Sequence, residues 1–457
     1  MSDPTAPYYT ADGVTLYLGD SLDVLPTLAD ESVDAIVTDP PYELGFMGRA
    51  WDASGIAYSV PLWRECLRVL KPGGHLVAFG GTRTYHRLVC AVEDAGFEVR
   101  DSLHWLYGSG FPKSLDVSKA LDKAAGAQRE VVGPNPLASK QTSKRGTSTL
   151  GDFAGVGALT APATADAARW QGWGTALKPA HEPIVLARKP LDGTVAATVL
   201  AHGTGALNID GCRVIGSAGG GRWGGKQERG IGYNGNTPDE YRTEAYDAGD
   251  GQVGRWPSNV ILTHPPLVDE HGNPIGDACA DGCVPGCPVA ELDAQSGTRT
   301  SGKMRAGTKR SNRDGWAGPM PATTSAETYG DSGGASRFFP VFRYQAKAPA
   351  RERPRLPDGT AHPTVKPLAL MQWLERLITP PGGTVLDPFT GTGPTLEAAR
   401  LEGFTGLGIE REQPHAELCR IRLDKPSTPA RAAEPARIRP RAPKPAPEQD
   451  ALFDEIA

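Results

Sequence analysis

A short apolar segment of the sequence, residues 34–38, runs directly into four residues that can hold and orient a flat heterocycle: Asp39, Pro40, Pro41 and Tyr42. The two prolines fix φ at about −65° and remove two N–H donors, so the backbone leaves the predicted strand along a rigid, extended path. The Asp39 carboxylate and the Pro40 carbonyl can each accept one hydrogen of an exocyclic amine, and the Tyr42 ring can stack on the heterocycle. This pattern predicts a site that orients an amine for attack on an electrophile. The alternative is a simple turn with an exposed Asp39.

A second candidate site lies far downstream, where residues 384–401 predict a strand, a tight turn and a helix. Gly391 and Gly393 allow the backbone of the turn to approach a ligand closely, and the helix N-terminus favours a ligand carboxylate. Asp387, at the end of the strand, can receive a ligand ammonium. Glu410 ends the next predicted strand, 23 residues after Asp387. That spacing is typical of the acid that binds ribose hydroxyls in a βαβ nucleotide-binding unit.

Together these segments resemble the motifs of the S-adenosylmethionine-dependent DNA amino-methyltransferases, which methylate adenine N6 or cytosine N4. Residues 39–42 resemble the catalytic motif, and residues 387–393 (Asp-Pro-Phe-Thr-Gly-Thr-Gly) resemble the cofactor motif. Residues 362–367 (His-Pro-Thr-Val-Lys-Pro) are similar to the segment that lies by the methionine end of the cofactor, and an acid after Gly19 faces the adenine in this family. The resemblance therefore implies these cofactor-binding residues: Asp20, Lys366, Asp387, Phe389, Gly391, Gly393 and Glu410.

The catalytic motif precedes the cofactor motif, which resembles the circularly permuted beta group of bacterial and phage enzymes. The resemblance implies a site-specific methyltransferase that acts on the N6 amine of an adenine flipped out of double-stranded DNA. Aspartate at position 39 is usual among the adenine enzymes, whereas serine is usual among the N4-cytosine enzymes. N4-cytosine methylation is the first alternative, and an RNA or protein amine methyltransferase or an inactive DNA-binding protein are further alternatives. Restriction-modification is the implied setting, although no endonuclease arrangement is apparent in the chain.

Alternating strand and helix patterns predict an α/β fold, a Rossmann-like doubly wound mixed sheet of the class I methyltransferase type, with a large irregular insertion for target recognition. A hairpin is expected around residues 12–13, and residues 181–190 are expected to add a strand to the same sheet. The predicted division is a catalytic half (8–190, with a loop or disordered excursion at about 125–174), an inserted target-recognition domain (191–350), a cofactor-binding half (351–425) and a disordered tail (426–457).

Composition and charge constrain where the protein works. The 457 residues carry a net charge of −5, so a DNA-binding surface must concentrate positive charge locally, as the acid-free run at residues 299–313 does. The alternative for that run is a solvated loop. The odd number of cysteines, seven, does not fit a secreted disulfide framework, and we find no leader or membrane span. These features predict a cytoplasmic protein that does not act at a membrane.

Three cysteines in the predicted insertion have a spacing that metal ligands can have. Cys279, Cys283 and Cys287 follow His264 and His271, and three thiolates with one histidine could form a closed structural zinc site. The alternative is a set of free thiols. The predicted ligands are His264, Cys279, Cys283 and Cys287.

Two further segments resemble known short motifs. Residues 220–227 nearly match a phosphate-binding loop, but Gln227 stands where Ser or Thr would bind magnesium, so no nucleoside triphosphatase is predicted. In the tail, Gln449, Leu452 and Phe453 are similar to the peptides by which bacterial replication proteins bind the sliding clamp. A chance match is the alternative for the tail peptide, because short motifs often match by accident.

Overall fold

The computed structural model describes most of the two predicted halves and separate parts of the predicted insertion. The described residues are 6–44, 53–107, 114–134, 158–214, 255–264, 266–268, 274–277, 279, 283–284, 287–300, 314–315, 318–319, 332–342, 354–359, 362 and 365–424. His271, the phosphate-loop-like residues 220–227, all of the basic run after residue 300 and the tail peptide lie outside these ranges. Within the described part of the chain, no helix combines the length and the apolar character that crossing a bilayer requires.

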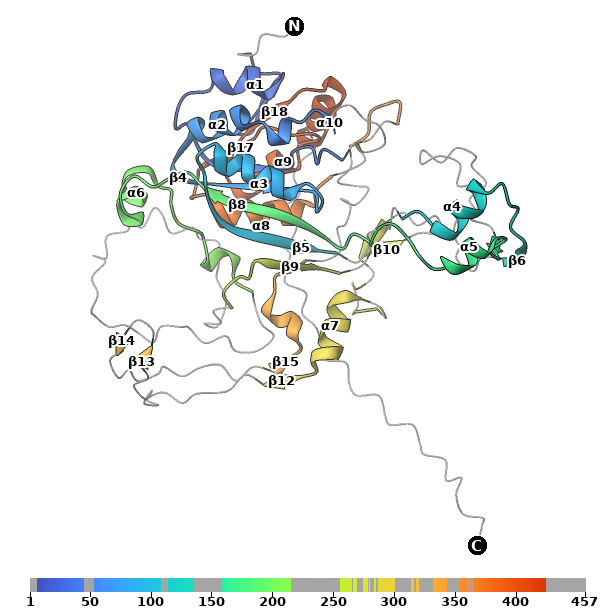
Figure 1. Ribbon diagram of the computed structural model, residues 1–457. Coiled ribbons are helices and arrows are strands. Elements are labelled where there is room, and N and C mark those ends of the chain that lie inside the picture. The colour runs from blue at the N-terminus through green and yellow to red at the C-terminus, as the bar shows by residue number, and fades with distance from the viewer. Residues whose placement is uncertain are drawn as a thin grey trace.

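A ten-stranded mixed sheet forms the centre of the fold, with the order β1-β2-β18-β17-β3-β4-β8-β5-β9-β16 (Figure 1). The strands from β2 to β4 in this order are parallel, and β8 runs antiparallel to both of its neighbours. The expected mixed sheet is therefore confirmed. The strands are β1 (Tyr9–Ala11), β2 (Val14–Leu18), β3 (Val33–Thr38), β4 (Leu70–Phe79), β5 (Glu98–Leu106), β8 (His181–Arg188), β9 (Val260–Thr263), β16 (Val341–Phe342), β17 (Thr384–Asp387) and β18 (Thr405–Glu410).

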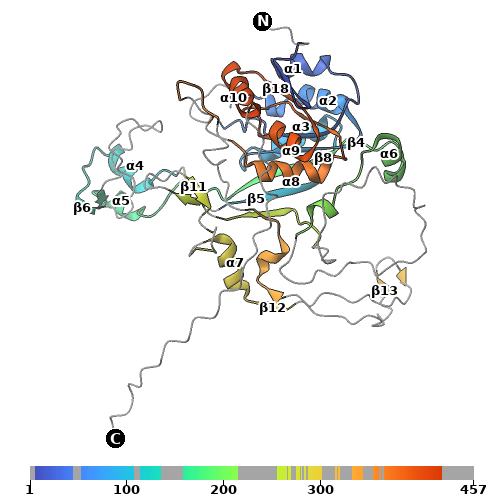
Figure 2. The ribbon, with the colours of Figure 1, turned by 180° about the vertical axis from the view of Figure 1, so that it is seen from behind.

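Helices cover both faces of the sheet, as its apolar strands require. Strand β3 is buried along its whole length, and its side chains alternate between two cores. Ile36 packs into the core beneath α2 and α3, whereas Ala35 and Val37 pack into the core beneath α8 and α9. Figure 1 shows the first face and Figure 2 the second. The helices are α1 (Ser21–Val24) with η1 (Leu25–Thr27), η4 (Ile56–Tyr58), α2 (Val60–Val69) and α3 (Tyr85–Asp94), and α8 (Leu368–Ile378), α9 (Pro394–Glu402) and α10 (Gln413–Leu423).

Two expected elements are confirmed near the predicted bounds. The hairpin β1–β2 turns at residues 12–13, and β8 (His181–Arg188) covers most of the strand expected at residues 181–190. Helix α2 ends at Val69, and the chain continues directly into β4 at Leu70. In the β3–β4 pairing, Val33 lies opposite Leu70 and Ala35 opposite His75. Residues 71–74 of β4 therefore lie opposite a single residue of β3, Asp34, and form a bulge, after which regular pairing resumes.

The predicted loop at about residues 125–174 is wrong for its described part, which is a small folded unit that stands away from the sheet in both views (Figures 1 and 2). The buried Asp122 carboxylate accepts hydrogen bonds from Ala163 N, Thr164 N, Thr164 Oγ1 and Arg129 Nη1. A polar network therefore holds this unit, and such a network leaves little apolar periodicity in the sequence. Its elements are α4 (Val117–Ala124), β6 (Val131–Pro134), β7 (Ala158–Thr160) and α5 (Ala165–Arg169).

The range predicted as an insertion, 191–350, also contributes to the main sheet, because β9 pairs with β5 and β16 pairs with β9. The division into domains therefore stays a prediction. The remaining elements of this range are α6 (Val195–His202), η6 (Asp210–Cys212), β10 (Pro266–Val268), β11 (Pro274–Asp277), α7 (Pro288–Ser296), β12 (Arg299–Thr300), β13 (Asp314–Gly315), β14 (Gly318–Pro319), β15 (Ser332–Gly333) and η8 (Ala335–Phe338).

Candidate active site

The two sequence motifs meet at one edge of the sheet, because β3 and β17 are parallel neighbours and both motifs follow their carboxyl ends. Thr38 Oγ1, in the last residue of β3, donates a hydrogen bond of 2.7 Å to Asp387 Oδ1, in the last residue of β17. Strand β8 runs the opposite way, so the start of β8, with Glu182, lies at the same edge. Segments more than 300 residues apart in the sequence thus form one site.

Asp39, Tyr42, Glu182 and Lys366 form a connected cluster at this edge. Lys366 Nζ donates to Asp39 Oδ2 at 2.6 Å and to Tyr42 Oη at 2.9 Å, and it lies 3.2 Å from Glu182 Oε2. Tyr42 Oη donates to Glu182 Oε2 at 2.7 Å. The ammonium also lies over the rings of Tyr42 and Phe79, 5.1 and 4.7 Å from their centroids. One buried cation therefore positions both chemical groups of the catalytic motif.

The charges of this cluster depend on one another. Burial raises the pKa of the Asp39 carboxyl above its usual range, and the Lys366 ammonium opposes that rise. Burial alone would lower the pKa of Lys366, but the carboxylates of Asp39 and Glu182 outweigh it and raise the pKa of this lysine. Burial and the same two acids raise the pKa of Tyr42 well above its usual value. Lys366 is therefore a cation and Tyr42 a neutral phenol at physiological pH.

One oxygen of Asp39 has unused hydrogen-bonding capacity. Oδ2 binds Lys366, whereas Oδ1 is buried and accepts no hydrogen bond from any residue in the described ranges. Buried acceptors without a donor are uncommon and often belong to functional sites. The free oxygen can accept an N–H donor from a bound molecule.

Asp387 is held rigidly at the end of β17. Its carboxylate accepts hydrogen bonds from Thr38 Oγ1, from Phe389 N at 3.0 Å and from Thr395 Oγ1 at 2.6 Å. A carboxylate has about four acceptor positions, so it can still receive one further donor. Burial raises the pKa of Asp387 to about 6, although these hydrogen bonds oppose the rise.

The turn between β17 and α9 has the conformation that its glycines predict. Gly391 has φ +56°, and a Cβ on it would have no atom closer than 4.0 Å, so one side of the turn is open to a ligand. Gly393 has φ +76° and caps α9, and a Cβ on it would collide with Cys419 Sγ. Glu410 fixes the turn from the next strand, because Oε2 accepts from Gly391 N at 2.8 Å and Oε1 accepts from Glu412 N at 2.7 Å. This turn can cradle a ligand that ends in a carboxylate and an ammonium.

A family model described as DNA methylase matches residues 33–193 and 289–420, which is more than half of the chain. The chain belongs to this family. Both candidate motifs lie inside the matched ranges, so the family resemblance inferred from the sequence is confirmed. The fold is correspondingly the permuted class I methyltransferase fold, and the unmatched central residues, 194–288, are fewer than the predicted insertion.

Individual relatives match over shorter stretches. A segment of 124 residues is 25% identical to the Type II methyltransferase M.PvuII of Proteus hauseri and covers 24% of this chain and 37% of that protein. Another of 69 residues is 36% identical to an uncharacterized protein of Methanocaldococcus jannaschii and covers 15% of this chain and 21% of that protein. The matches thus span well under half of these two relatives. A solved structure of the PvuII DNA methyltransferase, described as cytosine-N4-specific, aligns with 91% of this chain and 88% of its own at 13% identity and a TM-score of 0.40.

The predicted cofactor residues lie in three places in the structure. Asp387, Phe389, Gly391, Gly393 and Glu410 lie together around the turn after β17. Lys366, predicted to lie at the methionine end of the cofactor, places its ammonium against the catalytic motif, and its role toward the cofactor stays a prediction. Asp20 caps the first helix, where Oδ1 accepts from Leu22 N at 3.0 Å, and its Oδ2 lies 3.9 Å from Arg411 Nη1.

Three contributors were not expected from the sequence: Glu182, Thr38 and Thr395. The threonines follow or precede recognised motif positions, so their hydroxyls could have been considered as donors to Asp387. Glu182 offers no such signal, because its place depends on the antiparallel direction of β8. The predicted metal ligands His264, Cys279, Cys283 and Cys287 do lie together, in a separate cluster beside β9.

Proposed function

We propose that this chain methylates the exocyclic N6 amine of adenine in double-stranded DNA, with S-adenosylmethionine as the methyl donor. The observation that carries the proposal is the unsatisfied Asp39 Oδ1, in a catalytic motif joined through Thr38 to the Asp387 turn. An amine acceptor and a candidate cofactor cradle thus share one edge of the sheet. Methylation of cytosine N4 at the same site is the alternative.

The residues of the turn fit the donor molecule. Asp387 has room for an ammonium hydrogen bond, the open side of Gly391 admits a ligand, and the N-terminus of α9 favours a carboxylate. Glu410, at the end of β18, would accept hydrogen bonds from ribose hydroxyls, as such acids do in nucleotide-binding βαβ units. S-adenosylmethionine bound there would supply a methyl group attached to a sulfonium sulfur. A neutral amine can attack this methyl group and displace the sulfur.

The residues of the catalytic motif would orient the amine for transfer. Asp39 and the Pro40 carbonyl each accept one amine hydrogen, which localises the nitrogen lone pair, and Tyr42 stacks on the base. The nitrogen lone pair would form a bond to the methyl carbon as the carbon–sulfur bond breaks and leaves a neutral thioether, and the methylated, cationic amine would then release one proton to solvent water. Positioning supplies most of the rate in this scheme, so Asp39 need not act as a strong base.

The stacked and paired bases of a duplex shield the exocyclic amine of the target base. The proposal therefore includes flipping of that base out of the duplex toward Tyr42. Reading of the DNA sequence is assigned to the central insertion, whose basic run at residues 299–313 suits phosphate contacts. The sliding-clamp peptide, the restriction-modification setting and the cytoplasmic location stay predictions.

One feature of the sequence bears on the choice of base. Aspartate at position 39 resembles the adenine enzymes, whereas serine at this position is usual among the N4-cytosine enzymes. The motif therefore favours adenine. Intact catalytic and cofactor motifs argue against an inactive DNA-binding protein.

Nucleoside mass spectrometry tests the proposal directly. DNA is isolated from a methylation-free bacterial host that expresses the wild-type chain or, as a control, the Asp39→Ala variant. N6-methyldeoxyadenosine only in the wild-type sample is the expected result. Detection of N4-methyldeoxycytidine would show that the target base is cytosine and not adenine, and it would leave the proposed mechanism unchanged. If the protein is folded and binds S-adenosylmethionine but the DNA contains neither methylated nucleoside, the assignment as a DNA methyltransferase is overturned.

The raised pKa of Asp387 predicts that cofactor binding depends on pH. Below about pH 6 this carboxyl is mainly neutral and loses its attraction for the ligand ammonium, so affinity should fall by up to about tenfold per pH unit. Equilibrium dialysis with S-adenosylmethionine between about pH 5 and about pH 8 measures this loss. Asp387→Asn should bind weakly with little dependence on pH. An equally steep pH dependence in that variant would assign the titration to another group.

A further inference from the structure

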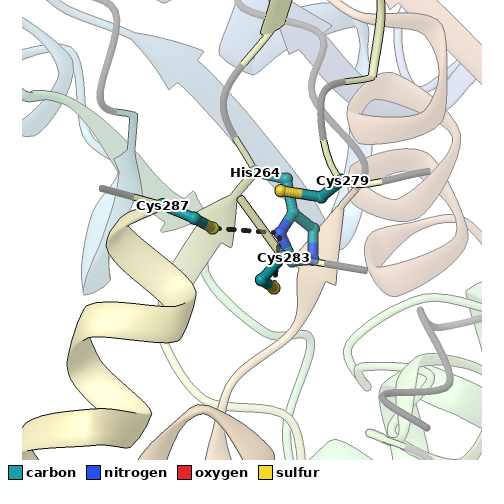
Figure 3. A group of neighbouring side chains, drawn as sticks. All are labelled: His264, Cys279, Cys283 and Cys287. Atoms are coloured by element: carbon teal, nitrogen blue, oxygen red, sulfur yellow. Dashed lines mark hydrogen bonds between the residues drawn. The ribbon is translucent and has the colours of Figure 1, made fainter. Parts of the chain in front are cut away.

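A compact group of three cysteines and one histidine lies beside β9, the strand next to the edge strand β16, and apart from the candidate active site. His264 follows β9 directly, Cys287 caps α7, and the chain between them supplies Cys279 and Cys283. One ligand atom from each of the four residues lies within 4.8 Å of the other three. Figure 3 shows the side chains converging from separate segments. No disulfide joins any of these cysteines.

The distances agree with those of a tetrahedral metal site. His264 Nδ1 lies 3.3 Å from Cys287 Sγ and 3.7 Å from Cys283 Sγ. With Zn–S bonds of about 2.3 Å and Zn–N bonds of about 2.0–2.1 Å, tetrahedral geometry gives ligand N···S separations of about 3.6 Å. A zinc ion therefore fits between these ligand atoms with small adjustments.

The histidine supports the same conclusion. His264 is 2% exposed, its Nδ1 faces the sulfurs, and its Nε2 accepts or donates no hydrogen bond within the described ranges. A buried imidazole held only by thiol contacts leaves much of its polar capacity unused. Nδ1, the ring nitrogen that faces the sulfurs, has only weak thiol contacts within the described residues, and a metal ion bound at Nδ1 would replace them with a strong bond while leaving Nε2 as it is.

The surrounding core is small enough to need such a crosslink. Among the described residues, four buried apolar side chains form the local core, Leu262, Cys279, Cys287 and Val289, and two of them are the cysteines themselves; the other apolar side chains packed against them are only partly buried. Small units with little core commonly depend on a metal or on disulfides. A metal here would fasten α7 to β9, the second strand from one edge of the main sheet.

We propose that His264, Cys279, Cys283 and Cys287 bind one structural zinc ion. Three thiolates and one imidazole form a soft donor set that zinc accepts in closed, four-coordinate sites. All four positions come from the protein, so the ion has no open position for catalysis. The role is to hold the segment between β9 and α7 in place, and it does not depend on methyl transfer.

Metal analysis of the full chain tests this proposal. Protein is expressed in zinc-supplemented medium, purified without chelators under reducing conditions, and analysed by inductively coupled plasma mass spectrometry. We expect one zinc per chain in the wild type. In Cys283→Ser, the zinc content after dialysis should fall to below about a tenth of that value, because removing one protein ligand greatly weakens the affinity of a structural site for zinc.

Cys90→Ser is the matched control, because Cys90 is also exposed but lies on α3, outside the cluster. It should keep one zinc per chain. A wild type without stoichiometric zinc, or equal zinc in wild type and Cys283→Ser, would overturn the proposal.

A measurement on the wild type covers the case in which Cys283→Ser fails to fold. The reduced, metal-free chain is titrated with Co²⁺, and its absorption spectrum is recorded. Thiolate-to-cobalt charge-transfer bands with the intense d–d bands of tetrahedral cobalt are expected, and they should disappear when Zn²⁺ is added. A spectrum of hydrated octahedral cobalt would show that the cysteines are ordinary thiols.

Discussion

Replacing Asp39 with alanine is expected to lower the rate of methyl transfer by about 10²–10³-fold, the usual effect of removing one preorganised hydrogen-bonding group from an active site. The variant removes the acceptor, Oδ1, that has no other described partner and that we assign to the target amine. The Asp387 turn is untouched, so the affinity for S-adenosylmethionine should stay the same. Single-turnover methylation of DNA and equilibrium dialysis of the cofactor measure the two quantities separately.

The fold should survive this substitution, because Lys366 keeps Glu182 as a partner at 3.2 Å. Asp94→Ala is a suitable control, since this exposed aspartate ends α3 away from both motifs. It should leave both quantities unchanged. Full activity in Asp39→Ala would remove the catalytic motif from the mechanism, and an equal loss of cofactor affinity would make Asp39 a cofactor residue.

The parts of the site that the sequence predicts are those encoded within one local segment. Residues 34–38 are apolar and lead into two prolines, so both the strand and the rigid exit from it follow from neighbouring residues. The turn at Gly391 and Gly393 is equally local, because positive φ values and the start of α9 at Pro394 depend on a few positions. The alternation of strands and helices also predicts a parallel sheet, but that β3 pairs with β17 is shown by the structure.

The parts that the sequence does not predict depend on contacts between distant segments. Glu182 reaches the site only because β8 runs antiparallel, and no local signal sets that direction. Lys366 belongs to a cofactor-like motif but reaches across to Asp39, 327 residues away. The unit around Asp122 is held by polar contacts, for which the apolar periodicity of the sequence gives no evidence. The local sequence pattern therefore identifies Asp39, but it does not predict that the charges of Lys366 and Glu182 lie beside it and shift its pKa.

Those charges lead to a second prediction, that Lys366→Met lowers methylation at neutral pH by about tenfold or more and shifts the pH profile to the alkaline side. Methionine fills much of the same space between the Tyr42 and Phe79 rings without the charge. Burial and Glu182 both raise the pKa of Asp39, and only the ammonium and the Tyr42 hydroxyl oppose them. Without the ammonium, Asp39 stays protonated to higher pH and cannot accept the amine hydrogen. Rates measured across a pH series in single-turnover experiments test this shift.

Adding Glu182→Gln to Lys366→Met gives the sharper experiment. The second substitution removes the neighbouring carboxylate that raises the pKa of Asp39, so the acid limb of the pH–rate profile, which Asp39 sets, should move back toward neutral pH. The double variant should then be more active at neutral pH than Lys366→Met alone, although Glu182→Gln by itself brings no gain. Lys119→Met, at an exposed lysine of α4, controls for the loss of a positive charge elsewhere. If the profile keeps its wild-type position in Lys366→Met, the lysine holds Tyr42 in place without setting the charge of Asp39. In that case only the rate, and not its pH dependence, should change.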